Sequence, residues 1–251
     1  MNWWLIGGLV VLYILIARLA DIVAGVANAR YQQGRHEDAL RIFQKAEKLG
    51  KLSLNNRMNS GYVALRLGNL KEARRILTIC SGMTPRDSAP RKHVRNLLAL
   101  VSWKEGDLEE AIEILEDIID SGFYNTQIYQ NLGIFYNLGD DKEKALAFAK
   151  EGYEYNGDDL IICDNLADAY AGVGDLEKSA EVYQALLEKE PHFPEAYYGY
   201  GKTLIAQGKL DEGKKYLEQS LTKTFSYLSI RSKKEIIELC KSYGVDTTQY
   251  E

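Results

Sequence analysis

Histidine and cysteine are the residue types in this chain that could bind a metal ion or attack a substrate. The three histidines, His36, His93 and His192, lie far apart and do not have the spacing of metal ligands. No two cysteines are separated by two residues, and neither a glycine-rich phosphate loop nor a nucleophile elbow is present. The sequence therefore predicts a protein that is not an enzyme and has no metal or cofactor.

The cysteines themselves indicate a reducing compartment. Cys80, Cys163 and Cys240 are odd in number, and each falls at an apolar position of a helical pattern. We expect them to be small core residues rather than disulfide partners or metal ligands.

A regular repeat is the strongest pattern in the chain. Small residues recur at spacings of 34, 38, 34, 34 and 34, namely Ala39, Ala73, Ala111, Ala145, Ser179 and Gly213. Such a period means that one small unit is repeated and stacked, with each small residue at a close crossing of two helices. Function is then expected on a long surface rather than in a catalytic pocket.

Turn residues recur in the same phase. A glycine lies where the first helix of each unit must end: Gly34, Gly68, Gly106, Gly139, Gly174 and Gly208. Residues suited to cap the second helix follow at once, at Asn69, Asp107, Asp140 and Asp175. No segment alternates with a period of two, so the predicted fold class is all-α.

These units resemble the tetratricopeptide repeat (TPR) family. The fourth carries Tyr129, Leu132, Gly133, Tyr136 and Ala145, and the fifth carries Leu166, Ala167, Tyr170, Gly174, Ser179, Tyr183 and Pro191. The resemblance implies a right-handed superhelical α-solenoid of about six helix–turn–helix units. The expected boundaries are an anchor at 1–19, a solenoid at 20–227 with units at 20–53, 54–91, 92–125, 126–159, 160–193 and 194–227, and a capping helix and tail at 228–251.

The amino terminus is predicted to form one transmembrane helix. Residues 1–17 contain no charged side chain, and about 25 Å of helix is the short end of what spans a bilayer. Arg18, Arg30 and Arg35 follow it, which predicts a single-pass protein with its solenoid in the cytoplasm. A buried core helix is an alternative, and so is a signal peptide cleaved after Ala29.

Charge is distributed unevenly. Residues 18–104 carry 17 Lys and Arg against 6 Asp and Glu, whereas residues 105–160 carry 3 against 15. The basic part suits an anionic membrane surface, and the acidic part argues against nucleic acid as a partner. Ordinary solvated helix faces are the simpler interpretation of the same charges.

The 38-residue spacing places four extra residues between the second and third units. A basic cluster lies in this stretch, made of Arg86, Arg91, Lys92 and Arg95. It could contact lipid head groups or an acidic partner, and a surface loop without a role is the alternative.

The predicted binding surface is a stripe on the first helix of each unit. Counted from the start of each unit, positions 4, 7, 8 and 11 are used in packing, which leaves positions 2, 5, 9 and 12 free. We name these free positions the inner stripe, because they lie on the concave wall of the expected solenoid. Its candidate partner-binding residues are Met58, Tyr62, His93, Asn96, Trp103, Gln127, Gln130, Asn137, Asp164, Asp168, Tyr198 and Lys202. Amides and aromatic rings along a groove suit an extended peptide or a partner helix.

Three hypotheses on function follow. The first is a membrane-tethered scaffold or adaptor that binds protein or peptide partners at the cytoplasmic side. The alternatives are an exported TPR protein of the cell envelope with an assembly role, and a subunit of an enzyme or transporter. A further expectation is a C-terminal cap at Ser232–Ser242, because a last repeat has no neighbour to cover it.

Overall fold

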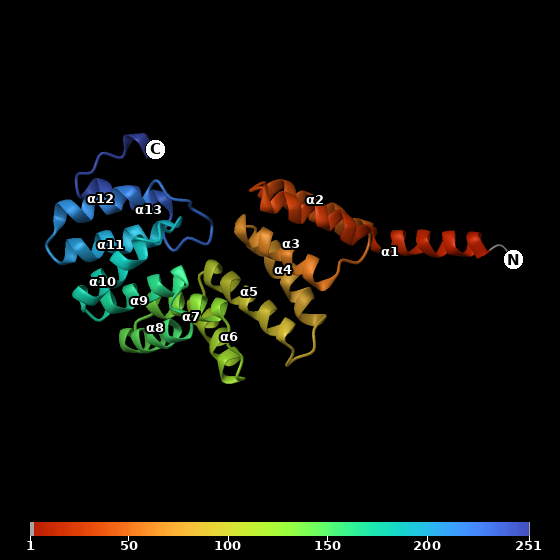
Figure 1. The fold of residues 1–251 in the computed structure, drawn as a ribbon, viewed down its shortest axis with the longest axis horizontal. Helices are drawn as coiled ribbons and strands as arrows, with labels where there is room; N and C mark the ends of the chain where they lie inside the picture. Colours follow the sequence, from red (N-terminus) through yellow and green to blue (C-terminus); the bar gives the residue numbers. More distant parts are fainter. Residues whose placement is uncertain (1–2, 251) are drawn as a thin grey trace. The chain divides into compact units, whose positions relative to one another are not determined.

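The computed structural model describes residues 3–250, with the side chains of residue 4 and residues 18–250. Over this range the chain forms thirteen α-helices and one short 3-10 helix, and no strand (Figure 1). The helices follow one another in pairs joined by tight turns. The chain divides into two compact units, Met1–Glu105 and Gly106–Glu251.

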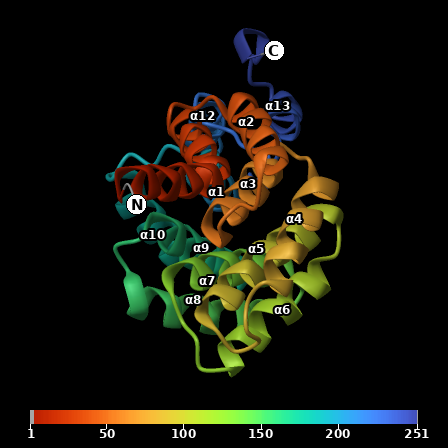
Figure 2. The same ribbon diagram turned by 90° about the vertical axis from the view of Figure 1, so that its right-hand side faces the viewer.

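The first unit contains two helical pairs and the first helix of a third pair. Its helices are α1 (Trp3–Gln32), α2 (His36–Leu49), α3 (Leu54–Arg66), α4 (Leu70–Gly82) and α5 (Ala89–Glu105). Figures 1 and 2 both show α1 and α2 as an antiparallel pair. Helix α5 has 17 residues whereas α3 has 13, so the four extra residues of the sequence become about one additional helical turn.

The predicted anchor coincides with the first part of α1. The expected boundary at residue 19 lies within one continuous helix that runs from Trp3 to Gln32. Apart from Trp4, the side chains of residues 1–17 lie outside the described part of the chain. Among the residues that are described, no helix is long and apolar enough to cross a membrane. The structure therefore gives the anchor no support.

The C-terminal half of α1 is the first helix of the first repeat. Ala20, Ala24 and Ala27 are buried. On another face of the helix, Asn28 donates a hydrogen bond to Asn56 of α3 at 2.9 Å and accepts one from Asn59 at 2.9 Å. Small buried residues and paired amides thus fix this helix against the second repeat.

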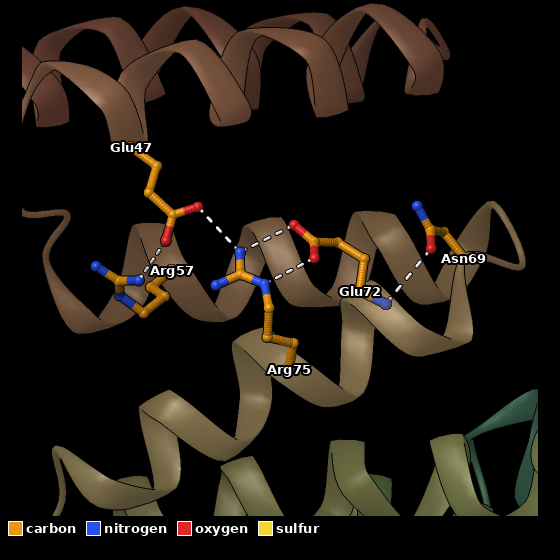
Figure 3. Close-up of polar contacts among 5 residues, drawn as sticks. All are labelled: Glu47, Arg57, Asn69, Glu72 and Arg75. Atoms are coloured by element: carbon orange, nitrogen blue, oxygen red, sulfur yellow. Dashed lines mark hydrogen bonds and ion pairs between the residues drawn. The ribbon is translucent and has the colours of Figure 1, made fainter.

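An ion-pair network joins three helices of the first unit (Figure 3). Glu47 of α2 accepts hydrogen bonds from Arg57 of α3 at 2.7 Å and from Arg75 of α4 at 3.1 Å. Arg75 also contacts both carboxylate oxygens of Glu72, at 2.8 and 2.9 Å, and thereby lowers the pKa of Glu72 from its usual 4.5. Only 11% of the Arg57 side chain is exposed, so its charge depends on Glu47 for compensation.

Replacing Glu47 by glutamine is expected to lower the free energy of unfolding by about 1–2 kcal/mol. This is less than the roughly 3–5 kcal/mol for breaking a fully buried pair, because 30% of the Glu47 side chain is exposed. Denaturant melts would measure the change. Glu37→Gln, on the same helix, is the control and should change stability little; equal losses in the two variants would refute the role of the network.

The second unit contains the remaining helices. They are α6 (Leu108–Asp120), α7 (Thr126–Leu138), α8 (Lys142–Asn156), α9 (Leu160–Gly172), α10 (Leu176–Leu187), α11 (Pro194–Ala206), α12 (Leu210–Ser220) and α13 (Lys233–Ser242). Helix α9 packs against α7 and α11, the first helices of the neighbouring repeats, as well as against α8 and α10. First helices therefore line one side of this unit.

The repeat phase predicted from the small residues is confirmed. All six are buried: the relative exposure is 0% for Ala39, Ala73, Ala111 and Ser179, it is 1% for Ala145, and Gly213 is also buried. At Gly213 the helices α11 and α12 cross so closely that an added Cβ would lie 2.6 Å from the carbonyl oxygen of Gly201.

Five of the six predicted turn glycines have positive φ, between 73° and 97°, and the sixth prediction is wrong. Gly139 has φ −74° and directly follows α7. It lies six residues before Ala145, whereas each of the other five glycines lies five residues before the small residue of its unit. The cap predicted at Asp140 is also wrong: Asp141 caps α8, and its side chain accepts a hydrogen bond from Lys144 N. Asp141 lies four residues before Ala145, the same spacing as in the units capped by Asn69, Asp107 and Asp175. The caps predicted at Asn69, Asp107 and Asp175 are confirmed.

The predicted C-terminal cap is present as α13. Ser232 and Glu235 form a capping box at its start, each side chain bonded to the backbone of the other. Ile236 and Cys240 are buried at 1% and 0% exposure against Leu217 and Leu221. The last repeat is thereby covered on its otherwise open side.

Candidate functional site

The inner-stripe residues of the first unit lie on α3 and α5. Met58, Tyr62, His93 and Trp103 are half-buried, whereas Asn96 is buried at 4% exposure. The Tyr62 ring lies edge-on to Tyr31, with ring centroids 6.1 Å apart, and its hydroxyl accepts a hydrogen bond from Arg66 at 3.4 Å. None of these five inner-stripe side chains is fully exposed.

Two amides of α7 form hydrogen bonds within the protein. Gln130 donates a hydrogen bond to Asp159 at 2.8 Å, and Asn137 donates one to the carbonyl of Asn165 at 2.9 Å. The first bond joins α7 to the residue that caps α9, and the second joins α7 to α9 itself. Gln127, by contrast, is exposed.

The basic cluster is mostly helical. Ser88 caps α5, so that Arg91, Lys92 and Arg95 lie in its first two turns and only Arg86 remains in the loop. The Arg91 guanidinium donates to the carbonyl and hydroxyl oxygens of Ser81 at the end of α4. Arg91 thus joins two helices, while Arg86 is exposed.

Three carboxyl groups converge on the inner stripe of the second unit. Asp164 and Asp168 are one helical turn apart on α9, and Glu195 lies at the start of α11. Burial and the charges of Asp168 and Glu195 raise the pKa of Asp164 well above its usual value of 3.8. We name these three residues the carboxylate cluster. They are not arranged to hold a metal ion, and no such group occurs elsewhere among the described residues.

Two members of the carboxylate cluster have partners within the protein. The Tyr183 hydroxyl donates a hydrogen bond to Asp168 at 2.5 Å, and Ile230 N donates one to Glu195 at 2.8 Å. Burial raises the pKa of both carboxyl groups, while these bonds act in the opposite direction. Asp164 differs, because its Oδ1 is buried without a hydrogen-bond partner.

A glycine on α11 makes the Tyr183 bond geometrically possible. A Cβ at Gly199 would lie 2.0 Å from the Tyr183 hydroxyl oxygen. Tyr183 is fully buried and reaches Asp168 through the space that this glycine leaves open. The inner-stripe rule missed Tyr183 and Gly199, because neither occupies a stripe position. Glu195 was also omitted from the predicted residues, although it occupies position 2 of the sixth unit, which starts at residue 194.

Two further inner-stripe residues stand beside the carboxylate cluster on α11. Tyr198 is half-buried, and Lys202 is exposed with its Nζ 5.5 Å from the centre of the Tyr198 ring. The positive charge of Lys202 acts on Asp168 and lowers its pKa, against the larger effect of burial. Of the twelve predicted residues, the structure brings together Asp164, Asp168, Tyr198 and Lys202.

Asp164→Asn is expected to raise the melting temperature at pH 7 and to leave it nearly unchanged near pH 4. A carboxyl group whose pKa is higher in the folded than in the unfolded state makes stability fall as the pH rises above the unfolded value, here 3.8. Asparagine cannot ionise, so this loss disappears. Melting curves from pH 4 to 8 would test it, with the exposed Asp211→Asn as control. A difference independent of pH would contradict the buried, protonated state of Asp164.

A cavity of about 530 Å³ lies away from the inner stripe. It is formed by the α10–α11 loop, α12 and the segment after α12. Lys223 lies 3.9 Å from the centre of the Tyr197 ring there, and Thr224 N donates to the His192 carbonyl at 2.9 Å. These contacts hold the loops together.

The cysteines occupy the predicted core positions. Cys80, Cys163 and Cys240 are buried and free. Burial raises the pKa of the Cys80 and Cys240 thiols to about 11, which disfavours the reactive thiolate at neutral pH.

The stacked helical pairs define a helical-repeat protein, and comparison with known proteins identifies the repeat. Three models of the tetratricopeptide repeat match residues 27–78, 93–121 and 170–225. The chain belongs to the tetratricopeptide repeat family.

Relatives share the fold at low sequence identity. A tetratricopeptide repeat protein from Parabacteroides merdae is 13% identical with a TM-score of 0.73, over 90% of this chain and 85% of that one. A thermophilic TPR protein from Thermus thermophilus is 21% identical with a TM-score of 0.60, over 74% and 99%. The BBSome complex member BBS4 of Bos taurus is 24% identical over 184 residues, which are 73% of this chain and 34% of that protein. The matched region thus spans about a third of that relative.

Proposed function

We propose that this protein is a scaffold that binds an extended peptide or a helix of partner proteins on the inner stripe of its repeats. The observation that carries the proposal is the composition of this stripe in the second unit. Tyr198 and Lys202 leave side-chain surface free on α11 next to a buried carboxylate cluster, whereas the apolar faces of the same helices are used in packing. Polar groups and aromatic rings on a rigid repeat surface suit a peptide ligand.

Site-specific photocrosslinking in the native host tests this function. A photoreactive phenylalanine analogue in place of Tyr198 should crosslink to a partner protein. The same analogue in place of Tyr153, a 45% exposed tyrosine on α8, should not. Crosslinks from Tyr153 but not from Tyr198 would overturn the proposed surface.

We further propose that the N-terminal segment tethers the protein to a membrane with the repeats in the cytoplasm. The uncharged sequence of residues 1–17 and the arginines that follow it favour this topology. Helix α1 continues without a break into that segment. A reporter fused to the C-terminus should be active only in the cytoplasm, and an active reporter outside would exclude this topology.

The exported alternative requires cleavage near Ala29. Cleavage there would remove most of α1, including the buried Ala20, Ala24 and Ala27. The first repeat would then lose one of its two helices, which disfavours this alternative. N-terminal sequencing of the mature protein decides between them: a mature protein starting at Arg30 would establish export.

A further inference from the structure

The carboxylate cluster buries carboxyl groups that have no ion-pair partner among the described residues. Burial raises the pKa of all three carboxyl groups, so the environment disfavours their charged forms. The side chain of Asp164 is 3% exposed, and its Oδ1 has no hydrogen-bond partner. A buried polar atom without a partner destabilises the fold, and such atoms are uncommon in native proteins unless a ligand completes them.

The cations around the cluster are engaged elsewhere. Lys202 lies over the Tyr198 ring, Lys142 donates to the Asn137 carbonyl at 2.9 Å, and Arg231 pairs with Glu235 at 3.4 Å. None of the described lysines or arginines forms an ion pair with Asp164, Asp168 or Glu195. Tyr183 from α10, Ile230 N and the Ser229 side chain also face the cluster.

We propose that the carboxylate cluster is the subsite for one basic side chain, lysine or arginine, of the peptide bound on the inner stripe. This inference rests on the proposed peptide-binding function and deepens it. The ammonium or guanidinium group enters between α9 and α11, where it neutralises Asp168 and Glu195 and displaces the proton of Asp164. The Tyr198 ring at the rim packs against the alkyl part of the entering side chain.

Proton release gives this subsite a distinct signature. Because the pKa of Asp164 in the free protein is raised well above 3.8, a cation that binds its charged form displaces a proton. The affinity for the basic peptide therefore rises with pH until Asp164 is ionised in the free protein. A peptide with norleucine at the basic position binds more weakly, and its affinity lacks this dependence on pH.

The test starts from a random peptide library selected on the full chain in mild detergent. We expect the selected peptides to share one lysine or arginine position. Asp168→Asn and Glu195→Gln keep the hydrogen bonds of these residues but remove charge, and each should weaken binding of a selected peptide about tenfold or more. Glu181→Gln, an exposed change on α10, should leave it unchanged. Calorimetry in buffers of different ionisation enthalpy should detect proton release in the wild type, which Asp164→Asn abolishes.

The outcomes separate the two proposals. Selected peptides without a basic position, or with affinities unaffected by Asp168→Asn and Glu195→Gln, would overturn the basic subsite and leave peptide binding intact. A library that yields no binding peptide at all would overturn both. Thermal melts of each variant confirm that any loss of affinity is not a loss of folding.

Discussion

A chain that ends at residue 228 is expected to melt at a lower temperature than the full chain and to self-associate. Its truncation removes α13, which buries Ile236 and Cys240 against Leu217 and Leu221. Ile236 alone, at 1% exposure, contributes about 2 kcal/mol of burial, so the total loss should exceed about 4 kcal/mol. The uncovered apolar face would then associate with a second molecule. Melting curves and light scattering measure both effects.

Two point substitutions test whether the destabilisation comes from the buried residues of α13 rather than from shortening the chain. Ile236→Asn introduces a polar group into the core beneath α13 and should reproduce most of the destabilisation. Glu238→Asn, two residues further on the same helix and exposed, should have little effect. A truncated chain that is as stable and monomeric as the full chain would show that α13 is not a cap.

Gly213→Ala is expected to lower the free energy of unfolding by about 1–3 kcal/mol. The added Cβ would lie 2.5 Å from Cγ1 of Ile205 and 2.6 Å from the carbonyl oxygen of Gly201. The second contact is with backbone, so the helices α11 and α12 must move apart to relieve it. Denaturant melts measure the loss.

The matched control for this substitution is Gly25→Ala. Gly25 lies within α1, and a Cβ there would meet nothing within 4 Å. The same chemical change should therefore stabilise the protein by about 0.5–1 kcal/mol, because alanine favours a helix. Equal effects at the two glycines would mean that the crossing of α11 and α12 is looser than described.

Local sequence signals were sufficient for the helices and most turns. The period of small residues located the helix crossings, and glycine followed by an acid or amide located the turns. The prediction for the α7–α8 turn was wrong because Gly139 lies one residue earlier in the repeat than the other turn glycines, while the cap Asp141 keeps the common phase. The residue type glycine thus located this turn less accurately than the distance to the small residue did.

The candidate site was predicted less completely. Stripe positions identified Asp164, Asp168, Tyr198 and Lys202, but not the buried state of Asp164. Burial raises the pKa of Asp164, and so do the charges of Asp168 and of Glu195, which comes from a helix later in the chain. The hydrogen bond of Asn137 could not be predicted for a similar reason, since its partner Asn165 is 28 residues away in the next repeat.

Hydroxyl-radical footprinting of the full chain, with and without a selected peptide, tests most directly whether the inner stripe is the binding surface. The modification rate of Tyr198 should fall several-fold on saturation with the peptide. The rates of Tyr153 and Tyr155 on α8, which are 45% and 51% exposed, should not change. Protection of Tyr153 and Tyr155 with an unchanged rate at Tyr198 would contradict binding on the inner stripe.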